Sequence, residues 1–413
     1  MLEVLIGLFF VVVAVDWVMV IYSVLVYLVY MLFSLSEAGQ EQLKLVFILL
    51  SLWLVIMMFM SVNNNLKGSE LMMIFMWLLI SLCFVFYVES LILFYLGFEM
   101  SVLPILFILF GWGYQPDRLE AGMYMLVYTV LFSLPLLLKI FSIEDMGCKM
   151  ESLSFFMFLM AFLVKIPMVG LHYWLPRAHV EAPVFGSMIL AGVMLKLGGY
   201  GVIKLSFIVG DLYFLYSKYI CYFSVLGSVY LSLMCFAQND MKLLIAYSSV
   251  IHMSIMLFGL LTLREVGLNG AIYMMVGHGF CSSGLFCILG FTYNRTCTRS
   301  MFLNKGLMIT IPFCSFWWFL FCASNLAFPP CLNLPGELFL CLSIVSYNWL
   351  MSYILVFFGV FSSLYSIYLF SFSQQSFTWT FFSFNSFKVQ ESFVLMLHWL
   401  PLNLLILDLS ILN

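Results

Sequence analysis

The chain is a succession of long apolar stretches separated by short polar breaks. A helix needs about 20 apolar residues to cross a bilayer, and stretches of this length recur from one end of the sequence to the other. A loop at 63–70 is followed by breaks at 111–120, 143–151, 175–183 and 293–300. The pattern predicts an all-α polytopic membrane protein of about 13 to 14 transmembrane helices.

After the first loop the predicted spans fall into two sets of five. The first set is 69–87, 90–111, 119–142, 153–175 and 184–206, and the second is 213–236, 242–263, 270–291, 307–347 and 350–372. The spacing predicts one integral membrane domain, 1–413, divided into N-terminal spans at 1–66, five-helix units at 67–206 and 207–373, and a C-terminal span at 374–413.

The fourth span of each set carries helix-breaking residues. Pro167 and Gly170 interrupt the first, and the second contains Pro329, Pro330, Pro335 and Gly336. Proline removes a backbone donor and clashes with the preceding turn, so both spans are predicted to be discontinuous helices. Matching broken helices indicate an internal repeat, and an odd number of spans per unit inverts one unit relative to the other. The alternative is that each proline only kinks its helix.

The N-terminal region does not fit a whole number of spans. Residues 1–33 would make a helix of about 50 Å, which is too long for one untilted span and short for two. Asp16 is a candidate turn between two short spans, and a further span covers 43–61. The first residues lack a basic signal region and an Arg-rich transit peptide, so we expect the chain to be inserted where it is made.

Composition excludes several functional classes. The chain is 65% hydrophobic and 8% charged, which is too apolar for a soluble fold of 413 residues. Its 16 basic residues form no stripe that could bind nucleic acid. None of the 11 cysteines forms a C-x-x-C pair, so no iron–sulfur, zinc or disulfide framework is expected. The nucleotide-binding and hydrolase motifs of soluble enzymes are missing from the sequence.

Three ionisable residues fall inside predicted spans, namely Glu99, Lys165 and Lys196. A charge at the bilayer centre costs roughly 3 kcal/mol, so such residues usually face a partner, a hydrated cavity or a proton path. Lys165 comes two residues before Pro167, where the half-helix should end with unpaired carbonyls that favour an ammonium. Fixed interhelical ion pairs are the alternative, but three such residues beside a helix break favour ion transport.

Two histidines lie near the centres of consecutive spans, His252 and His278. A single histidine on an apolar helix is most often a core residue with its hydrogen bonds satisfied. Two of them, with serines at 248, 249, 282 and 283 nearby, favour a hydrated path, because imidazole exchanges protons near neutral pH.

At these residues the sequence resembles a known family. The segments that carry the likeness are MAFLVKIPMVGLHYWLPRAHVEAPVFGSMILAGVMLKLGGYG, KLLIAYSSVIHMS, GHGFCSSGLFC and NLPGELF. They are similar to the subunit 4 family of mitochondrial NADH:ubiquinone oxidoreductase, respiratory complex I, over about residues 84–372. The family is antiporter-like, sharing ancestry with subunits of multisubunit sodium/proton antiporters.

The resemblance implies roles for particular residues. Glu99 in GFEMSVLP matches the acidic partner of the pumping lysine, Lys165 in VKIP matches that lysine, and Lys196 in MLKLGGYG matches the lysine of the central axis. Glu337 in NLPGEL matches the outer acidic residue, and His252 and His278 match the histidines between.

The residues around Glu337 also carry a local prediction. Asn333 or Leu334 can cap a new half-helix, with Pro335 at its first position and Glu337 in its first turn. The positive end of the helix dipole would then stabilise the Glu337 carboxylate. A capping role alone is the alternative.

The implied function is proton translocation in a multi-pass subunit of the mitochondrial inner membrane. The implied partners are neighbouring antiporter-like and other complex I subunits, membrane lipids and protons. NADH, FMN, iron–sulfur clusters and ubiquinone are expected in other subunits, with no cofactor and no metal bound by this chain. Rival hypotheses are a sodium/proton antiporter subunit and a non-pumping structural scaffold. The region before residue 66 is shorter than usual in the family, and Arg177 replaces a more frequent lysine.

Overall fold

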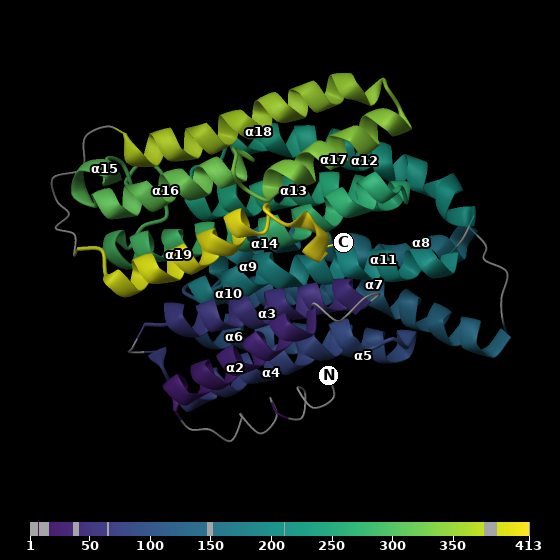
Figure 1. Ribbon diagram of the computed structural model, residues 1–413, viewed down its shortest axis with the longest axis horizontal. Helices are drawn as coiled ribbons and strands as arrows, with labels where there is room; N and C mark the ends of the chain where they lie inside the picture. The colour runs from purple at the N-terminus through teal and green to yellow at the C-terminus, as the bar shows by residue number, and fades with distance from the viewer. Residues whose placement is uncertain are drawn as a thin grey trace.

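The protein is a bundle of long helices that lie side by side (Figure 1). The computed structural model describes residues 7, 16–35, 41–63, 66–146, 152–209, 211–375 and 386–412. Within these ranges strand pairing is limited to one isolated bridge between Asp240 and Ser300. The predicted all-α class is confirmed.

The first half of the chain forms the lower part of the bundle in Figure 1. Its elements are α2 (Trp17–Leu35), α3 (Gln42–Ser61), α4 (Ser69–Tyr87), α5 (Leu91–Met100), α6 (Val102–Trp112), α7 (Arg118–Met146), α8 (Ser152–Lys165), α9 (Trp174–Glu181), α10 (Val184–Ile189), the π-helical segment η3 (Leu190–Met194) and α11 (Leu195–Val209).

The second half forms the upper part. Its elements are α12 (Asp211–Cys235), α13 (Met241–Thr262), α14 (Glu265–Thr296), α15 (Leu307–Thr310), α16 (Pro312–Asn325), α17 (Asn333–Tyr347), α18 (Met351–Gln374), α19 (Val389–Leu404) and the short 3₁₀ turn η4 (Leu409–Leu412). Ten helices of the described chain, counting α5 with α6 and α10 with α11, are long and apolar enough to cross a membrane.

Two helical paths are discontinuous where the prolines predicted interruptions. α8 ends at Lys165 and the helix resumes with α9 at Trp174. In the second half α16 ends at Asn325 and α17 begins at Asn333. The predicted breaks are confirmed, whereas the inverted relation of the two units and the unit boundaries stay predictions.

One predicted break is wrong. The segment 175–183 was expected to be a loop, but most of it is helix α9. Pro176 is the third residue of this helix, in the first turn, where backbone N–H groups have no intrahelical partner. A proline therefore fits there, and the helix ends only before Pro183.

At the N-terminal side, α2 begins at Trp17, directly after Asp16. This start agrees with a boundary at Asp16. The proposed short span before it falls on residues that, apart from Gly7, lie outside the described ranges.

Helix α14 is the central element, buried along its length by α13, α10, α17 and α19. Its approach to α17 depends on glycines, because a Cβ on Gly270 would lie 2.8 Å from the Cβ of Phe339 and 3.0 Å from the backbone N of Leu340. A Cβ on Gly277 would lie 2.3 Å from Asn333 Oδ1. These contacts place α17 directly against the face of α14 that carries Gly270 and Gly277.

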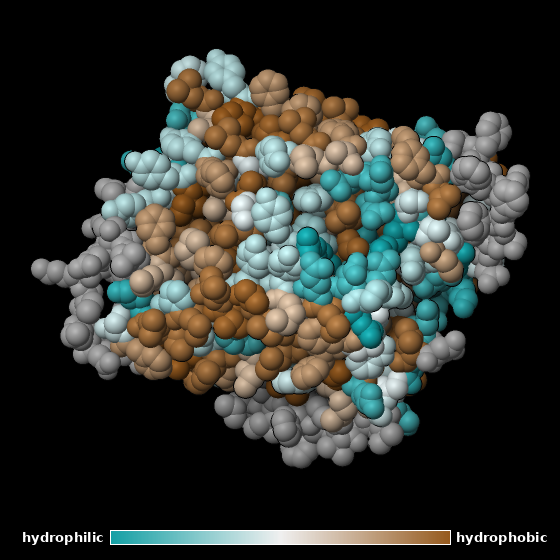
Figure 2. All heavy atoms as spheres, turned by 180° about the vertical axis from the view of Figure 1, so that it is seen from behind, coloured by the Kyte–Doolittle hydropathy of each residue, from teal (hydrophilic) through white to brown (hydrophobic). Residues whose placement is uncertain are grey.

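The outer helices expose apolar side chains instead of burying them. Examples are Leu131 and Leu138 on α7 and Val356 and Phe357 on α18, each more than half exposed. Figure 2 shows hydrophobic residues over much of one face, with hydrophilic residues gathered toward one side. Apolar surface on this scale suits a lipid environment, and the protein is a multi-pass membrane protein.

We expect Gly270→Val to destabilise the bundle by about 1–3 kcal/mol, because the added atoms would overlap the backbone of α17. Gly359→Val is the matched control, since a Cβ there meets nothing within 4 Å among the described residues. Thermal unfolding in detergent measures both variants. An unchanged melting temperature for Gly270→Val would contradict the close α14–α17 contact.

Candidate functional site

Lys165 is buried at the end of α8, with 2% of its surface exposed. Its ammonium lies 4.2 Å from the centre of the Phe98 ring, a cation–π contact. The Glu99 carboxylate is close enough to interact electrostatically with Lys165, but the two side chains form no direct ion pair in the described structure. The ring of Phe98 is therefore the group that contacts the Lys165 ammonium, and a direct contact with Glu99 stays a prediction.

Glu99 itself lies in the last turn of α5, where the helix is interrupted at Ser101 before α6. The Ser101 hydroxyl donates to the carbonyl of Phe98 at 2.8 Å. Pro104 follows in the first turn of α6 and cannot donate to the preceding turn. The interruption gives Glu99 a position in the middle of the α5–α6 path, one residue from the ring that contacts Lys165.

Outside the membrane-spanning segments, the connection between α4 and α5 is fixed by two lysines. Lys44 donates to Glu89 at 2.6 Å, and this hydrogen bond, reinforced by the charge of Lys44, holds the pKa of the Glu89 carboxyl below its usual value. Lys204 donates to the carbonyl of Val88 at 2.5 Å. These contacts tie α3 and α11 to the turn that precedes α5.

Lys196 is fully buried just after a π-helical segment. The wider π turn disturbs the regular hydrogen-bond ladder, a feature frequent at functional sites. The Lys196 ammonium donates back to the carbonyl of Ala191 inside this segment and lies 3.1 Å from His278 Nδ1. Lys196 therefore has one fixed backbone acceptor and one titratable neighbour.

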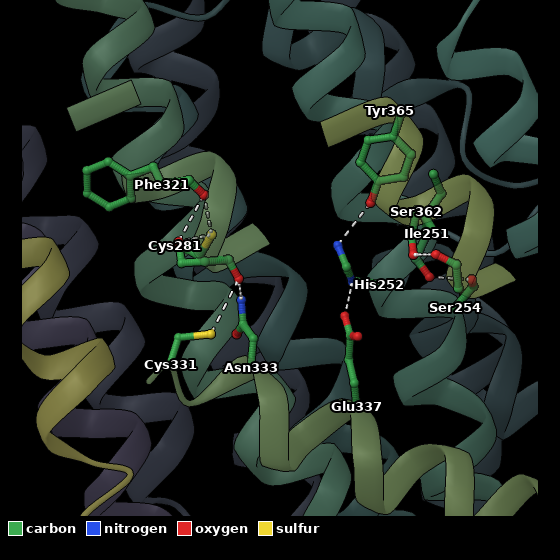
Figure 3. Close-up of polar contacts among 12 residues, drawn as sticks. Ile251, His252, Ser254, Cys281, Phe321, Cys331, Asn333, Glu337, Ser362 and Tyr365 are labelled. Carbon is green, nitrogen blue, oxygen red and sulfur yellow. Dashed lines mark hydrogen bonds and ion pairs between the residues drawn. The ribbon is translucent and has the colours of Figure 1, made fainter. Parts of the chain in front are cut away.

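The two predicted histidines continue this arrangement. The rings of His278 and His252 are tilted against each other with centroids 5.6 Å apart. His252 Nδ1 lies 3.4 Å from Glu337 Oε1, and its Nε2 lies 3.0 Å from the Tyr365 hydroxyl (Figure 3). If the tyrosine O–H donates to Nε2, then Nδ1 carries the hydrogen that faces Glu337.

The structure thus brings four predicted residues into one row, in which Lys196, His278 and His252 are buried and Glu337 is partly exposed. They come from α11, α14, α13 and α17, of which α13 and α14 are consecutive along the chain. Lys165 and Glu99 form a separate group. Helices α8 and α11 still approach closely, because a Cβ on Gly198 would lie 3.1 Å from Lys165 Cβ.

The position of Glu337 departs from the prediction. α17 begins at Asn333, so Glu337 is the fifth residue of the helix and lies beyond the first turn. Asn333 does not cap α17, because its side chain donates to the carbonyl of Ser324 at 2.9 Å. The helix-dipole effect fades after the first turn, so the contact with His252 is the main local interaction of Glu337.

A cluster of thiol, hydroxyl and amide side chains connects the two halves of the second broken helix (Figure 3). Cys281 Sγ lies 3.2 Å from Ser324 Oγ, and Cys331 Sγ lies 3.8 Å from the carbonyl of Ser324. Together with the Asn333 amide, these groups provide hydrogen-bond partners for Ser324 near the C-terminal end of α16. The contact with Cys281 also connects this end to α14. These groups fix where α17 starts, and therefore where Glu337 lies.

Several buried polar residues were missed by sequence reasoning. Tyr365 lies in an aromatic-rich helix, where nothing in the sequence distinguishes it from a core tyrosine. His179 and Glu181 were assigned to a loop, although both are buried in α9. Lys242, at the start of a predicted span, is also buried, with 3% of its surface exposed. The density of charged and histidine residues in 177–181 was the available signal.

The described residues contain no group of three or more His, Cys, Asp or Glu side chains placed to hold a metal ion. Most of the described cysteines are buried as free thiols in apolar surroundings.

Comparisons with known proteins place this arrangement in context. Residues 88–366 match the family model described as NADH:quinone oxidoreductase/Mrp antiporter, TM. The NADH-ubiquinone oxidoreductase chain 4 of Ceratitis capitata is 48% identical over 89% of this chain and 86% of its own length. That of Rhipicephalus sanguineus is 40% identical over 92% and 93%.

Solved structures share the fold at lower identity. A chain of respiratory complex I from Thermus thermophilus superposes with a TM-score of 0.88 at 18% identity, over 97% of this chain and 93% of that one. A chain of an Mrp complex from Dietzia sp. gives a TM-score of 0.77 at 18% identity, over 88% and 42%.

We expect Asn333→Leu to destabilise the protein by about 1–3 kcal/mol, because it leaves the buried carbonyl of Ser324 without its amide donor. Asn403→Leu is the matched control, since Asn403 is half-buried and donates to the carbonyl of Trp399 in its own helix. Thermal unfolding compares the two. Equal losses of stability would argue against a special role for Asn333 at the break.

Proposed function

The chain belongs to the NADH-ubiquinone oxidoreductase chain 4 family, and we propose that it moves protons across the mitochondrial inner membrane as one subunit of that complex. Electron transfer from NADH to ubiquinone takes place in other subunits, which carry the cofactors. The partners of this chain are the neighbouring membrane subunits and the lipids around them. The observation that carries the proposal is the row from Lys196 to Glu337, which is buried except at Glu337.

The row has the properties that proton transfer requires. Lys196 and His278 are within hydrogen-bond distance, and His252 contacts both Glu337 and Tyr365. The His278 and His252 rings are in contact, with their centroids 5.6 Å apart. Each imidazole can accept a proton on one nitrogen and release it from the other, so a proton can pass while the histidine returns to its starting state.

Lys165 and Glu99 act as the switch in this proposal. A buried ammonium is stabilised by the ring of Phe98 and by the nearby carboxylate, and withdrawal of either favours release of its proton. α11 carries Lys196 and packs against the end of α8. A change of charge at Lys165 therefore changes the electrostatic environment of Lys196, because the two residues lie on helices that pack against each other.

A sodium/proton antiporter subunit is the second candidate, favoured by the fold shared with a chain of the Mrp complex. Sodium dependence separates the two. If the proposal is correct, replacing sodium by potassium in reconstituted vesicles leaves proton movement unchanged. Loss of proton movement without sodium would favour the antiporter.

The direct test of the row is Glu337→Gln in the assembled complex. The amide keeps the shape of the side chain but cannot accept and release a proton, so we expect proton translocation through this subunit to fall at least about tenfold. Glu120→Gln is the control, because Glu120 pairs with Arg177 on the exposed surface. Proton movement per NADH oxidised is the measurement, and full pumping by Glu337→Gln would leave only a structural role.

The switch is tested by Glu99→Gln. Removing the carboxylate charge leaves Lys165 with the Phe98 ring as its main partner, so we expect reduced proton translocation with assembly intact. The amount of assembled complex on native gels controls for folding. Normal pumping in this variant would show that Glu99 does not act on Lys165.

A further inference from the structure

His179 is a buried histidine that the row does not use. It lies in α9 with no exposed surface, and neither ring nitrogen has a hydrogen-bond partner among the described residues. Its ring is stacked on Phe286 of α14, with centroids 4.5 Å apart and planes only 5° from parallel. Stacking covers one face of the imidazole and leaves both nitrogens available at its edge.

The same face of α14 leads from His179 to the row. His278, Ser282 and Phe286 are spaced four residues apart, so they lie one above the other along about 12 Å of helix. The Ser282 hydroxyl lies between the level of Lys196 and the level of His179. This hydroxyl donates to the carbonyl of His278 at 2.6 Å, and its oxygen can still accept a hydrogen bond.

The side chain of Lys196 points toward the end of the bundle where His179 lies. Its ammonium reaches back to the carbonyl of Ala191, five residues toward the start of its helix and so toward the end of α9. The positive charges of Lys196 and Lys242 both disfavour a charged imidazole at His179, so a proton has to leave one ring nitrogen as another arrives. His179 thus lies between a lysine in the middle of the bundle and a lysine near its end.

Beyond His179 lies a polar group at one end of the bundle. Lys242 donates to the carbonyls of Val180 and Ala182 at 3.2 and 2.7 Å, and Arg299 donates to that of Val180 at 2.7 Å. Glu181 is 5% exposed, and its Oε2 has no hydrogen-bond partner among the described residues.

This group is next to the surface. The backbone N of Tyr114, in the connection between α6 and α7, donates to the carbonyl of Glu181 at 3.4 Å. Asp117 in the same connection is exposed and acts electrostatically on Glu181. The polar residues therefore extend from Lys196 to the end of the bundle.

We propose that His179 is a second proton relay, connecting Lys196 with the group of Glu181 and Lys242 at this end of the bundle. Lys196 is then a branch point, with His278 on one side and His179 on the other. The relay moves one proton onto a ring nitrogen and releases one from the other nitrogen, with no net change in the histidine. This inference rests on the proposed function of the chain.

The test compares two substitutions in the assembled complex. His179→Phe keeps an aromatic ring stacked on Phe286 but has no nitrogen, whereas His179→Gln keeps polarity without the ring. A relay predicts that both variants lose proton translocation at least about tenfold while NADH oxidation continues in the presence of an uncoupler. A packing role predicts that His179→Phe is normal, and that result would overturn the proposal.

His398→Phe is the matched control. His398 is also fully buried, but it lies in α19 and its Nδ1 contacts the carbonyl of Val394 in the same helix. We expect this variant to pump normally. If Glu337→Gln blocks proton movement and His179→Phe does not, the branch is wrong and the row stands. If neither variant affects proton movement, the proposed function itself fails.

Discussion

The structure depends on one constraint, which is that a hydrocarbon interior offers no water to a backbone or side-chain polar group. Each interruption of a helix therefore needs its own partners. The Ser324 carbonyl receives the amide of Asn333, the Ala191 carbonyl receives the ammonium of Lys196, and the Phe98 carbonyl receives the hydroxyl of Ser101. Two of these hydrogen-bonding groups also serve the site. Lys196 belongs to the row, and Asn333 fixes where α17 begins. Stability and proton chemistry therefore depend on the same residues.

Much of the fold follows from the sequence because apolar length and proline position are local signals. The end of α8 at Lys165 and the interruption before α17 were both predicted from prolines. The errors have a common cause, which is that proline is tolerated in the first turn of a helix. Pro176 and Pro335 both lie at the third helical position, so α9 exists where a loop was expected and α17 begins earlier than predicted.

The sequence predicts the charged residues of the site but not their partners. Charged residues within apolar spans are conspicuous, and four of the six predicted residues lie in one row. Partners of ordinary appearance were not predictable, because contacts such as that between Tyr365 and His252 join positions 113 residues apart. Phe98 was equally hidden, since one phenylalanine among many gives no sign that it lies under an ammonium.

The π-helical segment before Lys196 has a consequence for how this sequence can change. A π turn contains one residue more than the α-helical turn it replaces, and each residue in an α-helix turns the chain by about 100°. Deleting any one residue within 190–194 would restore a regular helix and rotate everything before it relative to Lys196. The lysine could then no longer face His278 while α10 kept its contact with α14. Insertions and deletions should therefore be tolerated less in these five positions than most substitutions, whatever side chains they carry.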